Sequence, residues 1–242
     1  RIDQCLLMHP WINEALNGLQ ERSEETTQLA IRFGENTGSW LIQPTLTRTD
    51  IPITTGQSHY EEALFGRKFR IASPSFFQVN TRQTEHLIQL IRDRLDLKGH
   101  ETVVDAYAGV GTISVLLAPY ASRVIAIEES SSAVRDAKEN AYGLSNVEFF
   151  QAKTEIALGQ FVDAPDALVL DPPRSGCHYD VLSAVKRLQP NRIVYVSCNP
   201  ESLSRDLREL CPEPYQVDSV QPIDMFPQTH HVECVVTLSL AH

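Results

Sequence analysis

Hydrophobic and polar residues follow one spacing before about residue 72 of this chain and another after it. From residue 73 onward, short apolar runs rich in β-branched residues alternate with segments whose apolar residues recur at helical spacing. This alternation predicts a mostly parallel sheet covered by helices. The expected strands are 102–107, 124–128, 147–150, 167–171 and 192–196. The expected helices are 81–95, 111–120, 130–142, 154–160, 178–188 and 201–210.

Two more strand-like runs, near 215–220 and 232–238, close the chain with only a short loop between them. Strands joined so briefly pair antiparallel, because a parallel pair needs a long crossover connection. The pattern therefore predicts an α/β fold whose seven-stranded, mostly parallel sheet ends in an antiparallel hairpin.

Residues 1–72 have a different pattern. An apolar patch around Trp11 is followed by strand-like runs at 29–33 and 40–43, separated by turn formers such as Gly34 and Gly38. The apolar content predicts too small a core for independent folding. We expect a partial, β-rich domain here, or a cap, and a second domain over 73–242. The chain begins with Arg, which suggests that it starts inside a longer protein.

Composition narrows the setting. The 242 residues are 42% hydrophobic, as in ordinary globular proteins, and no apolar run could cross a bilayer or match a signal peptide. No membrane partner is expected. Five cysteines without disulfide-like spacing favour a reducing cytoplasm. A formal charge of −10 counts against a generic polyanion binder, unless a further domain supplies a basic surface.

The most informative cysteine is Cys198. It follows the apolar run 193–196 and precedes Pro200, a residue suited to the first position of a helix. A thiol just before a helix N-terminus feels the positive end of the helix dipole, which favours the thiolate. The carboxyl ends of strands are also where α/β sheets bind ligands. Cys198 is therefore predicted to be a nucleophile.

A glycine turn follows the first expected strand of the sheet. It reads Asp105-Ala-Tyr-Ala-Gly109-Val-Gly111, and glycines there let a ligand approach the backbone. The acid before the turn suits a positively charged ligand such as S-adenosylmethionine. Glu128 ends the next strand, where a carboxylate can accept ribose hydroxyls. The alternative interpretation is a structural turn beside a solvated glutamate.

Two further segments reach the same edge. Asp171-Pro-Pro-Arg174 forms a stiff loop after the fourth strand; alternatively it is a rigid turn with Arg174 paired to a surface acid. Glu233 interrupts the last apolar run, and partial burial would raise its pKa toward that of a useful base, although a glutamate at a strand start is more often solvated. Two histidines and a cysteine beside Glu233 have poor geometry for a metal.

Taken together, the motifs resemble those of the RNA uracil-5-methyltransferases, which form 5-methyluridine in tRNA or ribosomal RNA. They occur in the family's order over about 160 residues: S-P-S-F-F-Q-V-N (73–80), D-A-Y-A-G-V-G-T (105–112), D-P-P-R-S-G (171–176), V-S-C-N-P (196–200) and D-M-F-P-Q-T-H-H-V-E (224–233). The resemblance implies a Rossmann-like class I methyltransferase fold. It also implies S-adenosylmethionine contacts from Gln78, Tyr107, Gly109, Glu128 and Asp171.

The resemblance makes Cys198 the nucleophile, adding to C6 of a flipped-out uridine, and Glu233 the base that removes the C5 proton. Cys5 lies in a C-x-x-x-H-P setting that resembles one ligand position in the iron–sulfur branch of the family. A four-iron four-sulfur cluster would need three more ligands, expected upstream, where many members also carry a small RNA-binding β-barrel.

Two other functions stay open at this point. One is an exocyclic-amine methyltransferase that uses the D-P-P-R loop, with Cys198 a small buried hydrophobe. It would form no covalent adduct with 5-fluorouridine RNA and would tolerate Cys198→Ala. The other is a non-catalytic RNA-binding protein on the same fold. It would bind S-adenosylmethionine weakly and keep its function after Glu128→Ala.

Overall fold

The computed structural model describes residues 2–211 and 213–241 and divides into two compact units, Arg1–Phe77 and Gln78–His242. The boundary expected from the sequence, between residues 72 and 73, lies just before this division. Each unit has its own sheet structure. None of the helices in the described ranges is long and apolar enough to cross a membrane.

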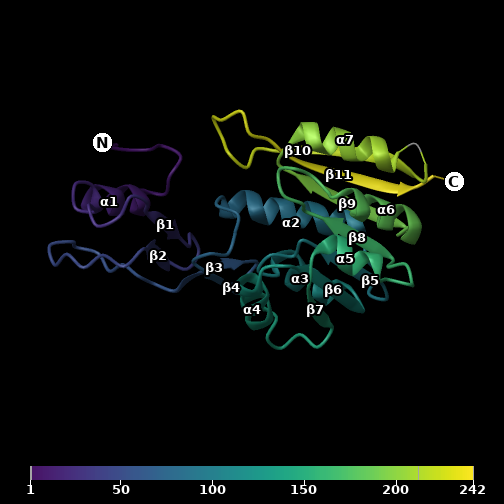
Figure 1. Ribbon diagram of the computed structural model, residues 1–242, viewed down its shortest axis with the longest axis horizontal. Coiled ribbons are helices and arrows are strands. Elements are labelled where there is room, and N and C mark those ends of the chain that lie inside the picture. Colours follow the sequence, from purple (N-terminus) through teal and green to yellow (C-terminus); the bar gives the residue numbers. More distant parts are fainter. Residues whose placement is uncertain (1, 212, 242) are drawn as a thin grey trace. The chain divides into compact units, whose positions relative to one another are not determined.

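The second unit is built on one seven-stranded sheet, ordered β10-β11-β9-β8-β5-β6-β7 (Figure 1). Strands β5 to β9 run parallel, whereas β11 pairs antiparallel with both β9 and β10. The predicted fold class is thereby confirmed. The strands are β5 (Thr102–Ala106), β6 (Arg123–Glu128), β7 (Val147–Gln151), β8 (Ala167–Leu170), β9 (Arg192–Ser197), β10 (Tyr215–Ile223) and β11 (Glu233–Leu240).

Strand β10 is longer than its apolar pattern predicted. The register shifts between Val217 and Ser219, and the strand then continues through Pro222. Because β10 is an edge strand, a proline that lacks an N–H is tolerated on its open side. The bulge and the proline break the alternation, which is why the sequence pattern ends too early.

Helices cover both faces of the sheet. Contacts group α2, α3 and α4 on one side and α5, α6 and α7 on the other. The helices are α2 (Thr81–Leu95), α3 (Thr112–Leu117) with a 3-10 turn η1 (Ala118–Tyr120), α4 (Ser131–Asn140), α5 (Thr154–Gly159), α6 (Tyr179–Leu188) and α7 (Pro200–Leu210). Each of the helices expected from the spacing is present.

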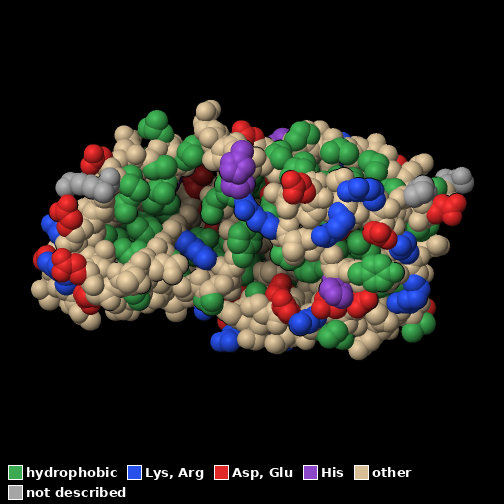
Figure 2. All heavy atoms as spheres, turned by 45° about the horizontal axis from the view of Figure 1, so that its top comes forward, with side chains coloured by type: hydrophobic (Ala, Val, Ile, Leu, Met, Phe, Trp, Pro, Cys, Tyr) green, Lys and Arg blue, Asp and Glu red, His purple; other side chains and the backbone are tan. Residues whose placement is uncertain are grey.

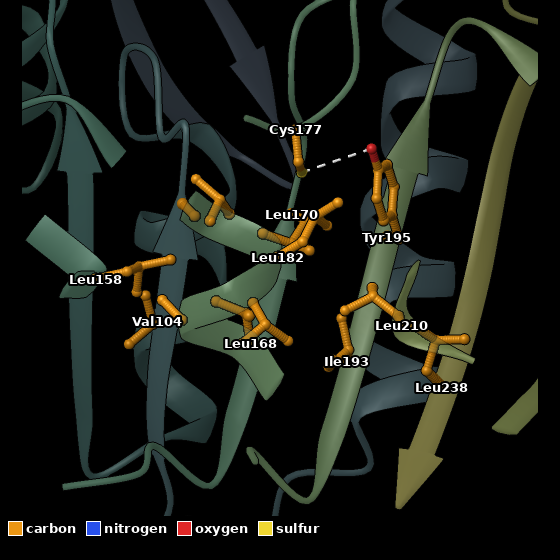
Figure 3. Close-up of a cluster of buried hydrophobic side chains, with 14 of the residues drawn as sticks. Val104, Leu158, Leu168, Leu170, Cys177, Leu182, Ile193, Tyr195, Leu210 and Leu238 are labelled. Atoms are coloured by element: carbon orange, nitrogen blue, oxygen red, sulfur yellow. Dashed lines mark hydrogen bonds between the residues drawn. The ribbon is translucent and has the colours of Figure 1, made fainter. Parts of the chain in front are cut away.

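The core of this unit fills the space between the sheet and helices α5 to α7. Val104, Leu168 and Ile193 project from neighbouring strands onto Leu182 of α6 and Leu210 of α7 (Figure 3). Burying one such side chain stabilises the fold by about 1.5–3 kcal/mol. This continuous apolar layer fixes the strand ends from which the polar residues described below project.

The first unit contains one helix and two hairpins: α1 (Pro10–Leu19), β1 (Ala30–Phe33) with β2 (Trp40–Gln43), and β3 (His59–Leu64) with β4 (Arg67–Ala72). Its own cluster of buried residues contains Ala15, Leu19, Ile42 and Leu46. Helix α1 supplies two of these residues, an apolar face that the strand patterns do not show, and the expectation that this core is too small for independent folding stays a prediction.

The hairpin β3–β4 was absent from the sequence-based expectation for a specific reason. Glu62 occupies a buried position of β3, where the alternation calls for an apolar residue. Its carboxylate accepts backbone N–H groups of Glu35, Asn36 and Ala63 at 2.8–3.0 Å. A buried carboxylate satisfied by backbone donors thus stands in for an apolar side chain and conceals the strand.

Candidate active site

The candidate site lies at the carboxyl edge of the parallel strands. The strand order reverses at β5, whose neighbours are β6 on one side and β8 on the other. In open α/β sheets such a reversal leaves a crevice at the strand ends, and ligands bind there. The polar residues predicted from the sequence follow β5, β6, β8 and β9 or begin β11.

The glycine turn is fastened to the next strand by Glu128. One carboxylate oxygen accepts the Gly109 N–H at 2.9 Å and the other accepts the Ser130 N–H at 2.7 Å. Gly109 and Gly111 both have left-handed φ angles, 55° and 80°. A side chain at Gly111 would also approach Ala137 of α4 at 3.1 Å. These glycines therefore hold a conformation that other residues adopt only with strain.

Asp105 lies beneath this turn and is fully buried. One of its oxygens accepts a hydrogen bond from the Ser114 hydroxyl, and Oδ1 has no hydrogen-bond partner among the described residues. Burial raises the pKa of Asp105 to about 7. A buried carboxylate oxygen without a donor is costly, and a cationic or N–H-bearing ligand would satisfy it. The residues of this turn therefore fit a positively charged cofactor.

Tyr107 takes the turn in a left-handed conformation, with φ 67°, which is uncommon for a residue with a side chain. Its side chain packs against the core of the second unit. Burial, followed by the charge of Cys177, raises the pKa of its hydroxyl above the usual range for tyrosine. The predicted cofactor contact by Tyr107 stays a prediction.

The antiparallel register brings the two predicted catalytic residues together. Cys234 of β11 pairs with Ser197 of β9 at the end of the ladder, and Glu233 and Cys198 are the residues next to this last pair. Directly opposed residues on paired strands have Cβ atoms about 4.5–5.5 Å apart. The charge of Glu233 accordingly acts on the Cys198 thiol. Neighbouring positions on two strands thus join residues that are far apart in the sequence.

Burial controls the ionisation of both groups. Glu233 is only 3% exposed, and burial raises its pKa to about 7, against a smaller lowering by Arg174. Burial also raises the pKa of the partly exposed Cys198 thiol, and Glu233 adds to that effect. The lowered thiol pKa expected from the helix dipole is therefore wrong in direction. Cys198 precedes the N-cap residue Asn199, and burial is the largest cause of the shift in its pKa.

Two members of the D-P-P-R loop complete this half of the edge. Asp171 is partly exposed but lies deep enough that burial, followed by the charge of Glu233, raises its pKa well above the usual value. The positive charge of the Arg174 guanidinium lowers the pKa of Cys198, opposing the effect of burial. Arg174 also lies 3.0 Å from Nδ1 of His231. It is the cation that favours a thiolate here.

Gln78 and Cys5 lie outside these contacts. Gln78 is partly exposed and precedes the N-cap of α2, Asn80, whose amide donates to the Met225 carbonyl at 3.2 Å. Cys5 is partly exposed in the first unit, where Asn13 bonds its backbone N–H and carbonyl. Within the described ranges, no group of three or more His, Cys, Asp or Glu residues could hold a metal. Both assignments stay predictions.

Sequence reasoning did not assign roles to Arg174, His231 or Asn199. Asn199 caps α7 through the Glu201 N–H and donates its amide to the Arg174 carbonyl, both at 3.0 Å. Each of these residues lies within a motif that the sequence had singled out. Membership of these motifs was the only signal in the sequence that could have pointed to the three residues. Their contacts could not be predicted, because only the fold places the loop beside the start of α7.

Comparison with known families identifies the region that carries this site. The sequence profile described as tRNA (uracil-5-)-methyltransferase matches residues 141–241, which include Asp171, Cys198 and Glu233. Over 92% of the chain, a protein of Thermosynechococcus vestitus named as an uncharacterized RNA methyltransferase is 40% identical. The chain belongs to the RNA uracil-5-methyltransferase family. It spans about half the length of that relative, of which it covers 49%.

Solved structures agree with the family assignment. The tRNA (uracil-54, C5)-methyltransferase of Pyrococcus abyssi, crystallised with S-adenosyl-L-homocysteine, superposes with a TM-score of 0.80. It is 27% identical, and the match covers 98% of this chain and 69% of that one. An rRNA methylase of Streptococcus thermophilus, 15% identical with a TM-score of 0.55 over 64% of this chain and 96% of its own, shares the fold. The class I methyltransferase fold implied by the motifs is thus confirmed.

Positively and negatively charged side chains are mixed on one face of this uracil-5-methyltransferase family member. Figure 2 shows Lys and Arg side chains interspersed with Asp and Glu on the face that it presents, rather than gathered into one stripe. With a net charge of −10, this face offers no broad field for a phosphate backbone.

Proposed function

We propose that this chain transfers a methyl group from S-adenosylmethionine to C5 of a uridine in structured RNA, through a covalent bond between Cys198 and C6. The observation that carries the proposal is the register of β9 and β11, which places Cys198 and Glu233 next to its last pair at the ligand-binding edge of the sheet. A thiol and a base so placed suit nucleophilic catalysis on a pyrimidine ring.

The glycine turn and its carboxylates would hold the cofactor. Gly109 exposes its backbone because nothing lies within 4 Å of the position of a Cβ, and Glu128 and Asp105 supply negative charge beside it. Gln78, Tyr107 and Asp171 are proposed contacts from the family resemblance. When bound, S-adenosylmethionine supplies an electrophilic methyl group on a positively charged sulfur.

The residues of the chain then perform the two covalent steps on the uracil ring. The Cys198 sulfur adds to C6, and the electrons of the C5–C6 double bond move toward C5 and O4, which makes C5 nucleophilic. Arg174 favours the thiolate that begins this step. After C5 carries its methyl group, Glu233 removes the remaining C5 proton. The double bond reforms and the electron pair of the C–S bond returns to Cys198.

A pKa near 7 suits Glu233 for that second step, because a base works best when its pKa is close to the working pH. The family profile and the neighbour from Pyrococcus abyssi are both named for tRNA uracil methylation, and we propose tRNA or ribosomal RNA as the substrate class. The five cysteines are free thiols in the described ranges, which suits a reducing compartment such as the cytoplasm.

The deciding experiment is to trap the adduct. Glu233→Gln should form the Cys198–C6 bond but release methylated RNA about 10²–10⁴-fold more slowly, because it lacks the base. With methyl donor and transcripts of tRNA or ribosomal RNA, it should accumulate a protein–RNA species that survives denaturing electrophoresis.

The matched control adds Cys198→Ala to the same variant, which should remove the species entirely. An exocyclic-amine methyltransferase would instead form no adduct and would keep its activity without Cys198. If the Glu233→Gln protein releases methylated RNA at the wild-type rate, the role of Glu233 as the base is wrong.

A further inference from the structure

Helix α7 holds the loop that follows β8 through three side chains. The Asn199 amide donates to the Arg174 carbonyl at 3.0 Å, and Nη2 of Arg205 donates to the Ser175 carbonyl at 2.8 Å. The Asp206 carboxylate accepts the Cys177 N–H at 2.7 Å. These bonds reach backbone groups of 174, 175 and 177, so the loop is fixed in place whatever its side chains are.

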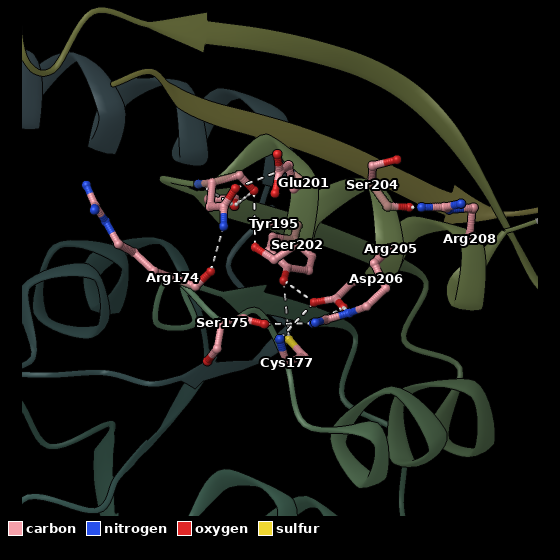
Figure 4. Close-up of polar contacts among 12 residues, drawn as sticks. Arg174, Ser175, Cys177, Tyr195, Glu201, Ser202, Ser204, Arg205, Asp206 and Arg208 are labelled. Atoms are coloured by element: carbon pink, nitrogen blue, oxygen red, sulfur yellow. Dashed lines mark hydrogen bonds and ion pairs between the residues drawn. The ribbon is translucent and has the colours of Figure 1, made fainter. Parts of the chain in front are cut away.

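Asp206 is the centre of this arrangement, and it is fully buried. One carboxylate oxygen accepts the Tyr195 hydroxyl at 2.6 Å as well as the Cys177 N–H, and the other accepts Nε and Nη2 of Arg205 at 2.9 and 2.6 Å (Figure 4). A buried carboxylate is tolerated only when donors surround it in this way. The hydrogen bonds that satisfy the buried Asp206 carboxylate therefore also fix the position of the loop.

The loop is itself shaped for close approach to α7. Gly176 has a φ of +79°, and a Cβ there would meet Arg205 Nη2 at 2.5 Å and Asp206 Oδ2 at 2.6 Å. Its N–H closes a tight turn onto the Pro173 carbonyl at 2.8 Å. Only glycine allows both the turn and the contact with the carboxylate.

This arrangement lies directly beside the proposed nucleophile. Helix α7 begins two residues after Cys198, and the first backbone group of the loop that is bonded there is the Arg174 carbonyl. Figure 4 shows the carbonyl of Arg174 turned toward α7 while its guanidinium extends away from the helix. That guanidinium lies 3.0 Å from Nδ1 of His231, and its charge lowers the pKa of the Cys198 thiol. Fixing the backbone of Arg174 therefore limits where its guanidinium can reach.

We propose that Asp206 and Arg205 are positioning residues: they hold the 174–177 segment against α7 so that the Arg174 guanidinium stays beside His231, where its charge acts on Cys198. The inference rests on the proposed function for its meaning in catalysis, although the contact it concerns can be measured without it. Neither residue touches the reacting atoms. Both act through Arg174.

The charges around Cys198 fix the direction of the expected effect. Glu233 from β11 and Asp171 from the loop after β8 disfavour the thiolate, and Arg174 is the cation that favours it, with His231 beside the guanidinium. If the loop moves and carries Arg174 away, the two carboxylates act unopposed. The Cys198 thiol should then ionise at higher pH and react more slowly near neutrality.

The test is the pH dependence of Cys198 alkylation by iodoacetamide in the full chain, followed by mass spectrometry of the Cys198 peptide. Arg205→Ala and Asp206→Asn should move the midpoint to higher pH and slow alkylation near pH 7 by about threefold or more. Arg208→Ala is the matched control, because Arg208 is exposed on the same helix and bonds the Ser204 carbonyl. It should leave the curve unchanged.

A second background separates positioning from a general loss of structure. In Arg174→Ala protein the midpoint should already be raised, and adding Arg205→Ala should move it no further, because the two changes act through one group. Arg205 is exposed, so its variant decides the matter even if Asp206→Asn does not fold.

An unchanged midpoint in folded Arg205→Ala protein, or an equal additional shift in the Arg174→Ala background, would overturn the proposal. Alkylation needs neither RNA nor a methyl donor. A failure of this inference is thus distinguishable from a failure of the proposed methyl transfer, which the adduct-trapping experiment tests separately.

Discussion

The two halves of the sheet edge use carboxylates in opposite ways. Beside β5 and β6, Glu128 has an N–H donor on each oxygen, and the two bonds fix the glycine turn. Beside β8, β9 and β11, Asp171 and Glu233 lie among apolar strands, and burial raises the pKa of each. One half is thus built to bind with a fixed charge, whereas the other is built to exchange a proton near neutral pH.

The difference shows that the environment of a carboxylate, and not its place on the sheet, determines whether its charged or its neutral form is favoured. Backbone N–H donors favour the charged form, and desolvation favours the neutral form. Asp105 belongs to the binding half but has one oxygen without a donor in the described residues, and burial raises its pKa to about 7. We expect a cationic cofactor to supply what the protein does not, and so to return Asp105 to its charged form.

The largest expected effect comes from removing the sulfur. Cys198→Ala should lower methyl transfer by about 10³-fold or more, as loss of a nucleophile does in other enzymes. Its affinity for S-adenosylmethionine should stay within about twofold of wild type, because the binding half of the edge is untouched. Transfer of a labelled methyl group and calorimetric titration measure the two quantities. A comparable loss of cofactor affinity would show that the halves are not separate.

The reverse experiment targets the binding half. Glu128→Ala removes the acceptor of two backbone N–H groups, each bond to a charged group being worth about 1.5–3 kcal/mol. S-adenosylmethionine should bind about 10- to 100-fold more weakly. The Glu233→Gln/Glu128→Ala double variant should still form the RNA adduct at saturating cofactor. Unchanged cofactor affinity would mean that Glu128 fixes the turn without contributing to cofactor binding.

Periodicity was sufficient for the architecture of the second unit because its parallel strands are buried on both faces. Runs such as 167–170 are uninterruptedly apolar and are bounded by turn residues. The same reasoning failed for β3, where Glu62 occupies a buried position, and for α1, which the sequence showed only as an apolar patch around Trp11. Polar residues buried with backbone partners are invisible to a pattern of hydrophobic positions.

The candidate site was predictable in its members but not in its contacts. Motif order named Cys198 and Glu233, whereas their adjacency comes from the pairing of β9 with β11, which local sequence does not encode. The direction of the Cys198 pKa was wrong because a helix start can be recognised in a sequence but burial cannot. Asp206 did leave a signal: it falls with Leu203 and Leu210 on the buried stripe of α7, where an acid requires partners.

The smallest expected effect concerns the free energy of unfolding. It tests whether the raised pKa of Glu233 makes the folded protein less stable at high pH. The folded protein holds the proton of Glu233 up to a pKa of about 7, whereas an unfolded glutamate loses it near 4.5. Between these values the folded state binds more protons, so this group's contribution to stability falls as pH rises through the window. Glu233→Gln does not titrate. The free energy of unfolding of the Glu233→Gln variant should therefore exceed that of wild type by about 1–3 kcal/mol at pH 8. This difference should disappear near pH 4.5. Asp105 titrates in the same window in both proteins and cancels from the difference, whereas loss of the Glu233 charge also lowers the pKa of Asp171, which acts in the same direction. Urea unfolding at the two pH values measures it. An equal difference at both would mean that Glu233 ionises at the sheet edge as readily as in water, and the contrast between the two halves would lose its physical basis.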